Sequence, residues 1–154
     1  MNFLWIFTEK ALFYKRFTPL KPRRTHEQQA VAMVASHRNL IAISLQNYDS
    51  IGRLRTPGYW NAASNRLYYA VFQLLYVGLF EKDKVKSDEA SIHDAVGRVV
   101  EEEYGHEISD LFHDLKRLRV DADYKGVFIG EERFEQMKSQ ADLKYDEIKR
   151  RVTA

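Results

Sequence analysis

Two arginines lie at positions of the sequence where the packing of a helix does not by itself require a charged side chain. Arg66 lies inside the most apolar stretch of the chain, and Arg119 lies four residues before Asp123 and five before Tyr124. A fully buried guanidinium needs a partner, because an unpaired charge away from water is strongly destabilising. A guanidinium that lines a cleft is instead suited to binding a phosphate or another anion.

Each arginine therefore has two interpretations. Arg66 could be a structural side chain paired with Asp121 or Asp123, or it could face an anion or a nucleotide. Arg119 and Asp123 are four residues apart, so on a helix they share a face and could form an ordinary solvated ion pair. In the other interpretation they line a polar cleft, in which Arg119 holds a phosphate and Tyr124 donates a hydrogen bond.

Two histidines follow a carboxylate at a spacing used by metal sites. Glu103 precedes His106 by three residues, and Asp110 precedes His113 by three. Di-iron bundles place such pairs on different helices, whereas these pairs lie seven residues apart and Gly105 falls inside one of them. The sequence also has no glycine-rich phosphate loop and no HExxH motif. We therefore predict no metal and no cofactor.

The composition excludes several classes of function. The chain has no cysteine, which excludes disulfide scaffolds, thiolate zinc sites and cysteine nucleophiles. This is typical of a reducing compartment, so we expect a cytoplasmic protein. The 24 basic and 22 acidic residues leave a formal net charge of +2. Such a charge does not indicate nucleic-acid binding by itself, so any contact with RNA or DNA has to come from a local patch.

The elements that must position these side chains are predicted to be helices. Only 3 prolines and 7 glycines occur in 154 residues, and none of the prolines follows Pro57. The regular turn signals of a β-sandwich or barrel are therefore missing. Apolar residues recur at helical spacing in five segments, at about 25–52, 59–80, 90–103, 107–123 and 131–152. We predict an all-α, up-and-down helical bundle of about five helices, with the second helix at its centre.

Residues 1–24 differ in composition from the rest of the chain. Six aromatic residues fall within the first 17, and five basic residues without an acid lie between residues 15 and 24. The apolar run at 3–7 is too short for a secretory signal or a membrane helix. We predict an extension at 1–24, which is either loosely packed or an amphipathic arm for a partner or a membrane surface. A helical domain follows at 25–154 and begins with a capping box at Thr25.

Three sequence blocks, in matching order and spacing, resemble the HEPN domain, a small α-helical family, and in particular its UPF0332-type branch. The blocks begin at Asn61, Ser91 and Leu115 and read NAASNRLYYAVF, SIHDAV and LKRLRVDADY. They are similar to the family patterns A-x-N-R-x-Y-Y-A-x-F, T-H-x-x-V and L-x-x-x-R-x-x-A-D-Y. The resemblance covers about residues 30–150 and implies the family's helical fold.

Many HEPN proteins are metal-independent endoribonucleases, and the resemblance extends this expectation to the present chain. In the family an arginine is followed a few residues later by a histidine, and two such motifs meet at a homodimer interface. The arginine stabilises charge on the phosphorane, while the histidine moves a proton. In this chain the positions after Arg119 hold Tyr124, Lys125 and Gly126, none of which normally titrates near pH 7. His93 is the candidate substitute for that histidine.

The resemblance also implies a partner. Similar HEPN proteins are often encoded beside a minimal nucleotidyltransferase, in a pair that resembles a toxin–antitoxin system. In some pairs that enzyme modifies a tyrosine near the HEPN site, for which Tyr124 is the local candidate. We expect a homodimer that binds RNA, a nucleotide or the nucleotidyltransferase, with alternatives of an endoribonuclease toxin and a purely structural interaction module. The predicted ligand-binding residues are Arg66, Tyr69, Arg119 and Asp123, and the catalytic candidates are Arg119, Tyr124 and His93.

Overall fold

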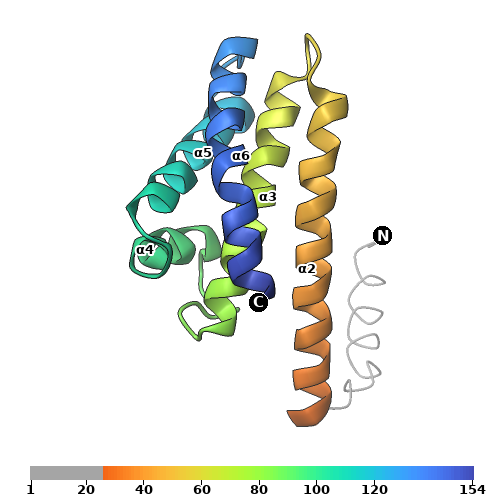
Figure 1. The fold of residues 1–154 in the computed structure, drawn as a ribbon, viewed down its shortest axis with the longest axis vertical. Coiled ribbons are helices and arrows are strands. Elements are labelled where there is room, and N and C mark those ends of the chain that lie inside the picture. The colour runs from red at the N-terminus through yellow and green to blue at the C-terminus, as the bar shows by residue number, and fades with distance from the viewer. Residues whose placement is uncertain (1–25) are drawn as a thin grey trace, which may run out of the picture. The chain divides into compact units, whose positions relative to one another are not determined.

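The structure is a computed structural model that describes residues 26–154, with side chains from residue 35 onward. Five helices make up this part of the chain, and no strand occurs within it (Figure 1). They are α2 (His26–Leu54), α3 (Trp60–Glu81), α4 (Ile92–Tyr104), α5 (His106–Tyr124) and α6 (Glu131–Thr153). The predicted all-α helical bundle is confirmed. The predicted extension at 1–24 and the capping box at Thr25 lie outside the described residues.

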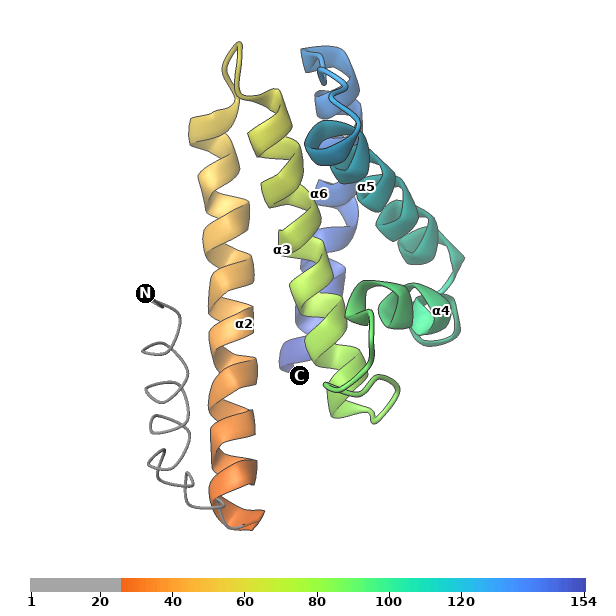
Figure 2. The ribbon, with the colours of Figure 1, turned by 180° about the vertical axis from the view of Figure 1, so that it is seen from behind.

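Helix α3 forms the centre of the bundle. Thirteen of its residues are buried, and it packs against α4, α5 and α6. From residue 34 onward, α2 runs alongside α3, as both views show (Figure 2). The Ser44 hydroxyl of α2 donates a hydrogen bond of 2.7 Å to the carbonyl oxygen of Ala70. The prediction that this most apolar segment is the central helix is therefore confirmed. None of the helices in residues 26–154 is long and apolar enough to cross a membrane.

Two glycines occupy backbone positions that a residue with a side chain would not fit. Gly105 has a φ of 88°, which L-residues with a side chain rarely adopt, and it separates α4 from α5. A Cβ atom at Gly78 of α3 would overlap the Tyr104 hydroxyl and lie 2.8 Å from Val152. The absence of a side chain at Gly78 thus lets the ends of α4 and α6 meet α3 directly.

The side chain of Asn61 holds the connection between α5 and α6 against the first turn of α3. Its amide nitrogen donates to the carbonyl oxygens of Ala122 and Val127, both at 3.0 Å. Its amide oxygen accepts from the backbone N–H of Ile129 at 2.9 Å. An asparagine side chain can donate and accept at once, so one residue satisfies three backbone groups of this connection.

Candidate functional site

Arg119, on α5, is held by hydrogen bonds in one orientation beside α3. Its Nη2 atom donates to the hydroxyls of Tyr69 at 3.1 Å and Tyr124 at 2.7 Å. Its Nε atom donates to Oδ2 of Asp123 at 3.2 Å. The Arg119 side chain keeps 15% of its surface exposed. The predicted ion pair between Arg119 and Asp123 is present, and the arginine side chain is largely enclosed.

Three tyrosine rings surround the same guanidinium. Its Cζ atom lies 4.9 Å from the ring centroid of Tyr124, 5.4 Å from that of Tyr69 and 5.7 Å from that of Tyr68. Such distances allow attraction between the cation and the electron-rich ring faces. Because the Arg119 side chain is largely enclosed, its hydrogen bonds are screened by water less than those of a fully exposed arginine.

Two of the five N–H donors of Arg119 remain available. None of its hydrogen bonds to the described residues uses Nη1, which carries two N–H groups. In the described part of the chain, no fully buried side-chain nitrogen or oxygen lacks a hydrogen-bond partner. Nη1 is therefore not fully buried. The other three donors orient the guanidinium, and no hydrogen bond to a described residue uses Nη1.

Asp123 is shared between two donors. Its Oδ2 atom accepts from Nδ2 of Asn65 on α3 at 2.6 Å, as well as from Arg119. Asn65 and Tyr69 are four residues apart, so they lie on the same face of α3 and both reach α5. The sequence predictions did not include Asn65 in the site, although its spacing from Tyr69 is a signal that could have placed it there.

His93 lies in the first turn of α4, close to the Arg119 cluster. Its Nδ1 atom is 2.6 Å from the hydroxyl oxygen of Tyr68, and its ring stacks on the Tyr68 ring at 5.7 Å. Burial lowers the pKa of His93, and the positive charges of Arg119 and Lys116 lower it further, against a smaller opposite effect of Asp94. The imidazole is therefore neutral at pH 7.

Tyr68 connects the histidine to the arginine. Its ring contacts both side chains, and it is a second residue that the sequence predictions left out of the site. Burial raises the pKa of Tyr68, so the hydroxyl keeps its proton at neutral pH. Of the predicted site residues, Tyr69, His93 and Arg119 contact the buried Tyr68. Asp123 and Tyr124 join the cluster through Arg119.

Arg66 does not join this cluster. It is exposed, and its Nη1 atom donates to Oδ1 of Asn47 on α2 at 3.1 Å. The predicted pairing of Arg66 with Asp121 or Asp123 is wrong, because Asp121 pairs with Arg133 and Asp123 pairs with Arg119. The face of α3 that meets α5 carries the residues one before and three after Arg66, so Arg66 itself turns toward α2.

The carboxylate–histidine pairs do not assemble into a metal site. Glu103 pairs with Lys82 at 3.1 Å and Lys84 at 2.8 Å, on the connection before α4. Within residues 26–154, no group of three or more histidine, aspartate or glutamate side chains is placed to hold a metal ion.

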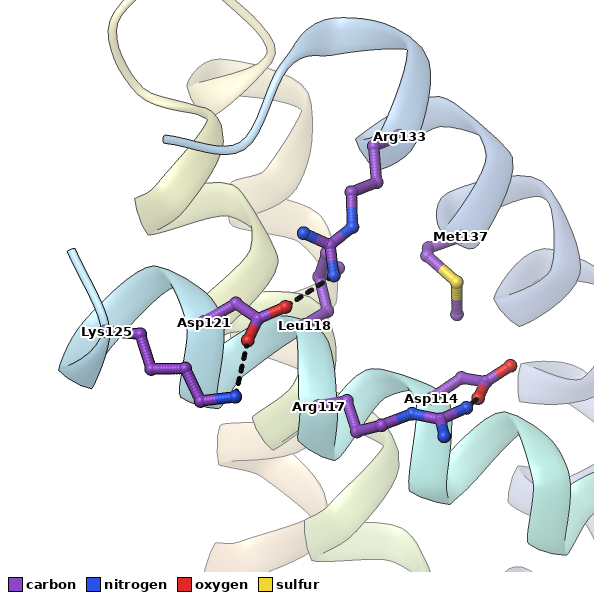
Figure 3. A pocket seen from close by; sticks show the side chains of 7 residues that line it. All are labelled: Asp114, Arg117, Leu118, Asp121, Lys125, Arg133 and Met137. Atoms are coloured by element: carbon purple, nitrogen blue, oxygen red, sulfur yellow. Dashed lines mark hydrogen bonds and ion pairs between the residues drawn. The ribbon is translucent and has the colours of Figure 1, made fainter. Parts of the chain in front are cut away.

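A hollow of about 340 Å³ lies on a different side of α5 (Figure 3). It faces α6, whereas Arg119 faces α3. Two sets of ion pairs line it: Asp121 binds Arg133 at 2.6 Å and Lys125 at 3.1 Å, and Arg117 binds Asp114. These paired charges do not converge on the Arg119 cluster, which remains the candidate site.

Comparisons of the chain with family models, with curated proteins and with solved structures give no significant match.

Proposed function

We propose that this protein is a HEPN-like domain that binds a nucleotide or RNA phosphate through Arg119. The proposal places it in a toxin–antitoxin-like pair with a nucleotidyltransferase. The observation that carries phosphate binding is the fixed guanidinium whose Nη1 atom is not fully buried. The HEPN assignment is supported by convergence of the three sequence blocks, since Tyr69, His93 and Arg119 come one from each block and surround Tyr68.

The physical case for a phosphate rests on preorganisation. A hydrogen bond between a guanidinium and a phosphate is charge-assisted, and it is stronger than a neutral one. Arg119 is already oriented by Tyr69, Tyr124 and Asp123, so little conformational entropy is lost when a ligand arrives. The carboxylate of Asp123 accepts a hydrogen bond from Asn65 as well as from Arg119. Because Asp123 is shared in this way, it neutralises the positive charge of Arg119 only in part.

Fluorescence polarisation with a labelled nucleotide and a short labelled RNA tests this binding. We expect Arg119→Ala to weaken both affinities at least tenfold, because it removes the only proposed phosphate ligand. Arg66→Ala is the matched control, since Arg66 is an exposed arginine outside the cluster. Circular dichroism checks that both variants are folded. Equal affinities of the wild-type protein and Arg119→Ala would refute the proposal.

A second candidate function is metal-independent RNA cleavage, and the position of His93 favours it. A neutral imidazole near an arginine has the components for moving a proton while the cation stabilises phosphorane charge. Incubation of RNA in the presence of EDTA should then give fragments, and His93→Ala or Arg119→Ala should abolish them. His113→Ala is the control, because His113 is an exposed histidine of α5. Intact RNA with the wild-type protein, together with normal growth of bacteria that express it, would exclude this activity.

The proposal includes a homodimer and a protein partner. Light scattering at micromolar concentration should give twice the mass of the chain, and a strictly monomeric mass would exclude a composite site. A nucleotidyltransferase encoded next to this gene should co-purify with it. Tyr124 is the proposed target of modification by that enzyme, and its exposed ring is accessible. Mass spectrometry after incubation with the partner and ATP should show an added nucleotide that Tyr124→Phe prevents.

A further inference from the structure

The hydroxyl group of Tyr68 has a single hydrogen-bond partner. The residue is fully buried, at 0% exposed, and among the described residues its hydroxyl is bonded only to Nδ1 of His93, at 2.6 Å. Burial raises the pKa of Tyr68 and lowers the pKa of His93, so neither group is charged at neutral pH. The two neutral groups share one hydrogen bond, and one of them has to donate the proton in it.

The direction of this hydrogen bond follows from the burial of Tyr68. If Nδ1 of His93 carried a proton and donated it, the hydroxyl hydrogen of Tyr68 would have no acceptor among the described residues and no contact with solvent. A buried donor without a partner is strongly disfavoured. Tyr68 therefore donates and Nδ1 accepts. A neutral imidazole has one protonated nitrogen, so the proton of His93 lies on Nε2.

The imidazole ring of His93 is also fixed by its aromatic neighbours. It stacks on the Phe72 ring, with centroids 4.2 Å apart and an interplanar angle of 28°, and it meets the Tyr69 ring edge-on at 6.1 Å. Nε2 forms no hydrogen bond with a described residue and is not fully buried. The ring thus presents one unused N–H group, whose direction is set by Tyr68 and Phe72 together.

This N–H group and Arg119 lie beside the same two tyrosines. The Cζ atom of Arg119 is 5.7 Å from the ring centroid of Tyr68 and 5.4 Å from that of Tyr69. The ring centroid of His93 is 5.7 Å and 6.1 Å from the same two centroids. Nη1 of Arg119 and Nε2 of His93 both carry donors and no acceptor, and neighbouring donors of this kind suit an anionic oxygen.

We infer that Tyr68 positions His93 as an Nε2–H donor, which adds a second ligand beside Arg119 for the same phosphate group. The inference rests on the proposed function, because Arg119 supplies the charge that attracts the phosphate. Neutral imidazoles with a lowered pKa serve as hydrogen-bond donors to oxygen in this way. Nε2 has no lone pair to accept a proton in this tautomer. The inference therefore deepens phosphate binding and not the second candidate function, in which His93 moves a proton.

Nuclear magnetic resonance tests the tautomer without any ligand. Proton–nitrogen correlation spectra of isotope-labelled histidines distinguish protonated from unprotonated ring nitrogens, and the signals that are missing in His93→Gln identify His93. At pH 7.5 we expect a protonated Nε2 and an unprotonated Nδ1. A protonated Nδ1 in the wild-type protein overturns the inference.

A variant of Tyr68 tests its positioning role in the same spectra. Tyr68→Phe removes only the hydroxyl group, so the Nδ1 signal of His93 should shift because the nitrogen loses its donor. Tyr145→Phe is the matched control, since it removes another buried hydroxyl, which is bonded to Ser44. The His93 signals should stay unchanged in this control. An unchanged Nδ1 signal in Tyr68→Phe shows that Tyr68 does not position His93 and overturns the inference.

Two replacements of His93 test its role in binding. His93→Phe keeps an aromatic ring against Phe72 but has no donor, whereas His93→Gln keeps an N–H donor near the position of Nε2. Titrations with inorganic phosphate and with a labelled mononucleotide measure the effect. We expect His93→Phe to weaken both affinities about tenfold, as for the loss of one hydrogen bond to a charged group, and His93→Gln to restore most of the loss. A general base would not be replaced by glutamine.

The outcomes separate this inference from the proposed function. Phosphate binding that depends on Arg119 but is equal in the wild-type protein and His93→Phe overturns only the inference. Failure of the wild-type protein to bind either inorganic phosphate or the mononucleotide overturns both proposals.

Discussion

At the scale of single residues, Arg119 serves two purposes that can be separated. It orders the tyrosine cluster through three hydrogen bonds, and its Nη1 atom is not fully buried. Asp123 retains Asn65 as a partner when the arginine is removed. The Asp123 carboxylate then still has one hydrogen-bond partner. It does not become an unpaired buried charge, which would be strongly destabilising.

We therefore predict that Arg119→Met lowers the free energy of unfolding by about 1.5–3 kcal/mol, since it removes three hydrogen bonds that each contribute about 0.5–1 kcal/mol. The same variant should lose phosphate binding. Urea unfolding followed by circular dichroism measures the first effect, and nucleotide titration measures the second. A loss above about 3 kcal/mol would show that Arg119 mainly locks the bundle, as a purely structural interaction module requires.

His93 should make stability depend on pH. Its pKa is lowered in the folded protein, so the unfolded chain takes up the proton first as the pH falls. The stabilisation is present above the unfolded pKa of about 6.5 and is lost as the pH falls through the lower folded value. The urea midpoint should drop between pH 7.5 and pH 5, and the drop should be smaller for His93→Gln. An identical drop in both proteins would contradict this role of His93.

Some contacts of the candidate site could be predicted from the sequence, and others could not. Arg119 and Asp123 were recognisable because a spacing of four residues places two side chains on one helix face. Arg66 was misplaced because α3 is apolar on several sides, so no polar face indicates which side meets α5. The sequence pattern also did not predict where α4 packs. The sequence could therefore name His93 as a candidate but could not predict its contact with Tyr68.

At the scale of elements, the connection between α5 and α6 depends on one amide side chain. Asn61→Ala removes three hydrogen bonds and leaves the backbone N–H of Ile129 without its partner. Unsatisfied backbone groups next to a buried residue are destabilising, so we predict a loss of about 2–3 kcal/mol in the free energy of unfolding. Limited proteolysis should cut Asn61→Ala between α5 and α6 sooner than the wild-type protein.

Asn65→Ala is the matched control for this prediction. It removes an asparagine from the same helix, but that side chain bonds only the partly exposed carboxylate of Asp123. A comparable loss of stability in Asn65→Ala would show that Asn61 has no special role in the connection.

The helix boundaries were predictable because glycine and proline mark them. The segments predicted at 107–123 and 131–152 correspond to α5 (His106–Tyr124) and α6 (Glu131–Thr153), with differences of one residue at most at each end. Gly105 interrupts the helices where its φ is positive, as the sequence pattern indicated. Asn61 gave no comparable signal, because its partners are backbone groups more than 60 residues away.

At the scale of the whole molecule, the central position of α3 requires close packing on more than one side. Gly78→Ala would place a methyl group against the Tyr104 hydroxyl and Val152, which belong to α4 and α6. Overpacking of this kind is destabilising by about 1–3 kcal/mol. We predict a lower thermal midpoint for Gly78→Ala, measured by circular dichroism. Gly52→Ala is the control, because a Cβ atom there meets nothing within 4 Å.

The cluster around Tyr68 draws its side chains from α3, α4 and α5, so it exists only when these three helices are assembled. The ligand that we propose for Arg119 should therefore bind the folded chain and not the unfolded one. Its binding free energy adds to the stability of the fold by about 2.7 kcal/mol at a concentration of one hundred times Kd. A rise in the melting temperature, absent in Arg119→Met, can thus report the natural ligand from a panel of nucleotides before any reaction is known.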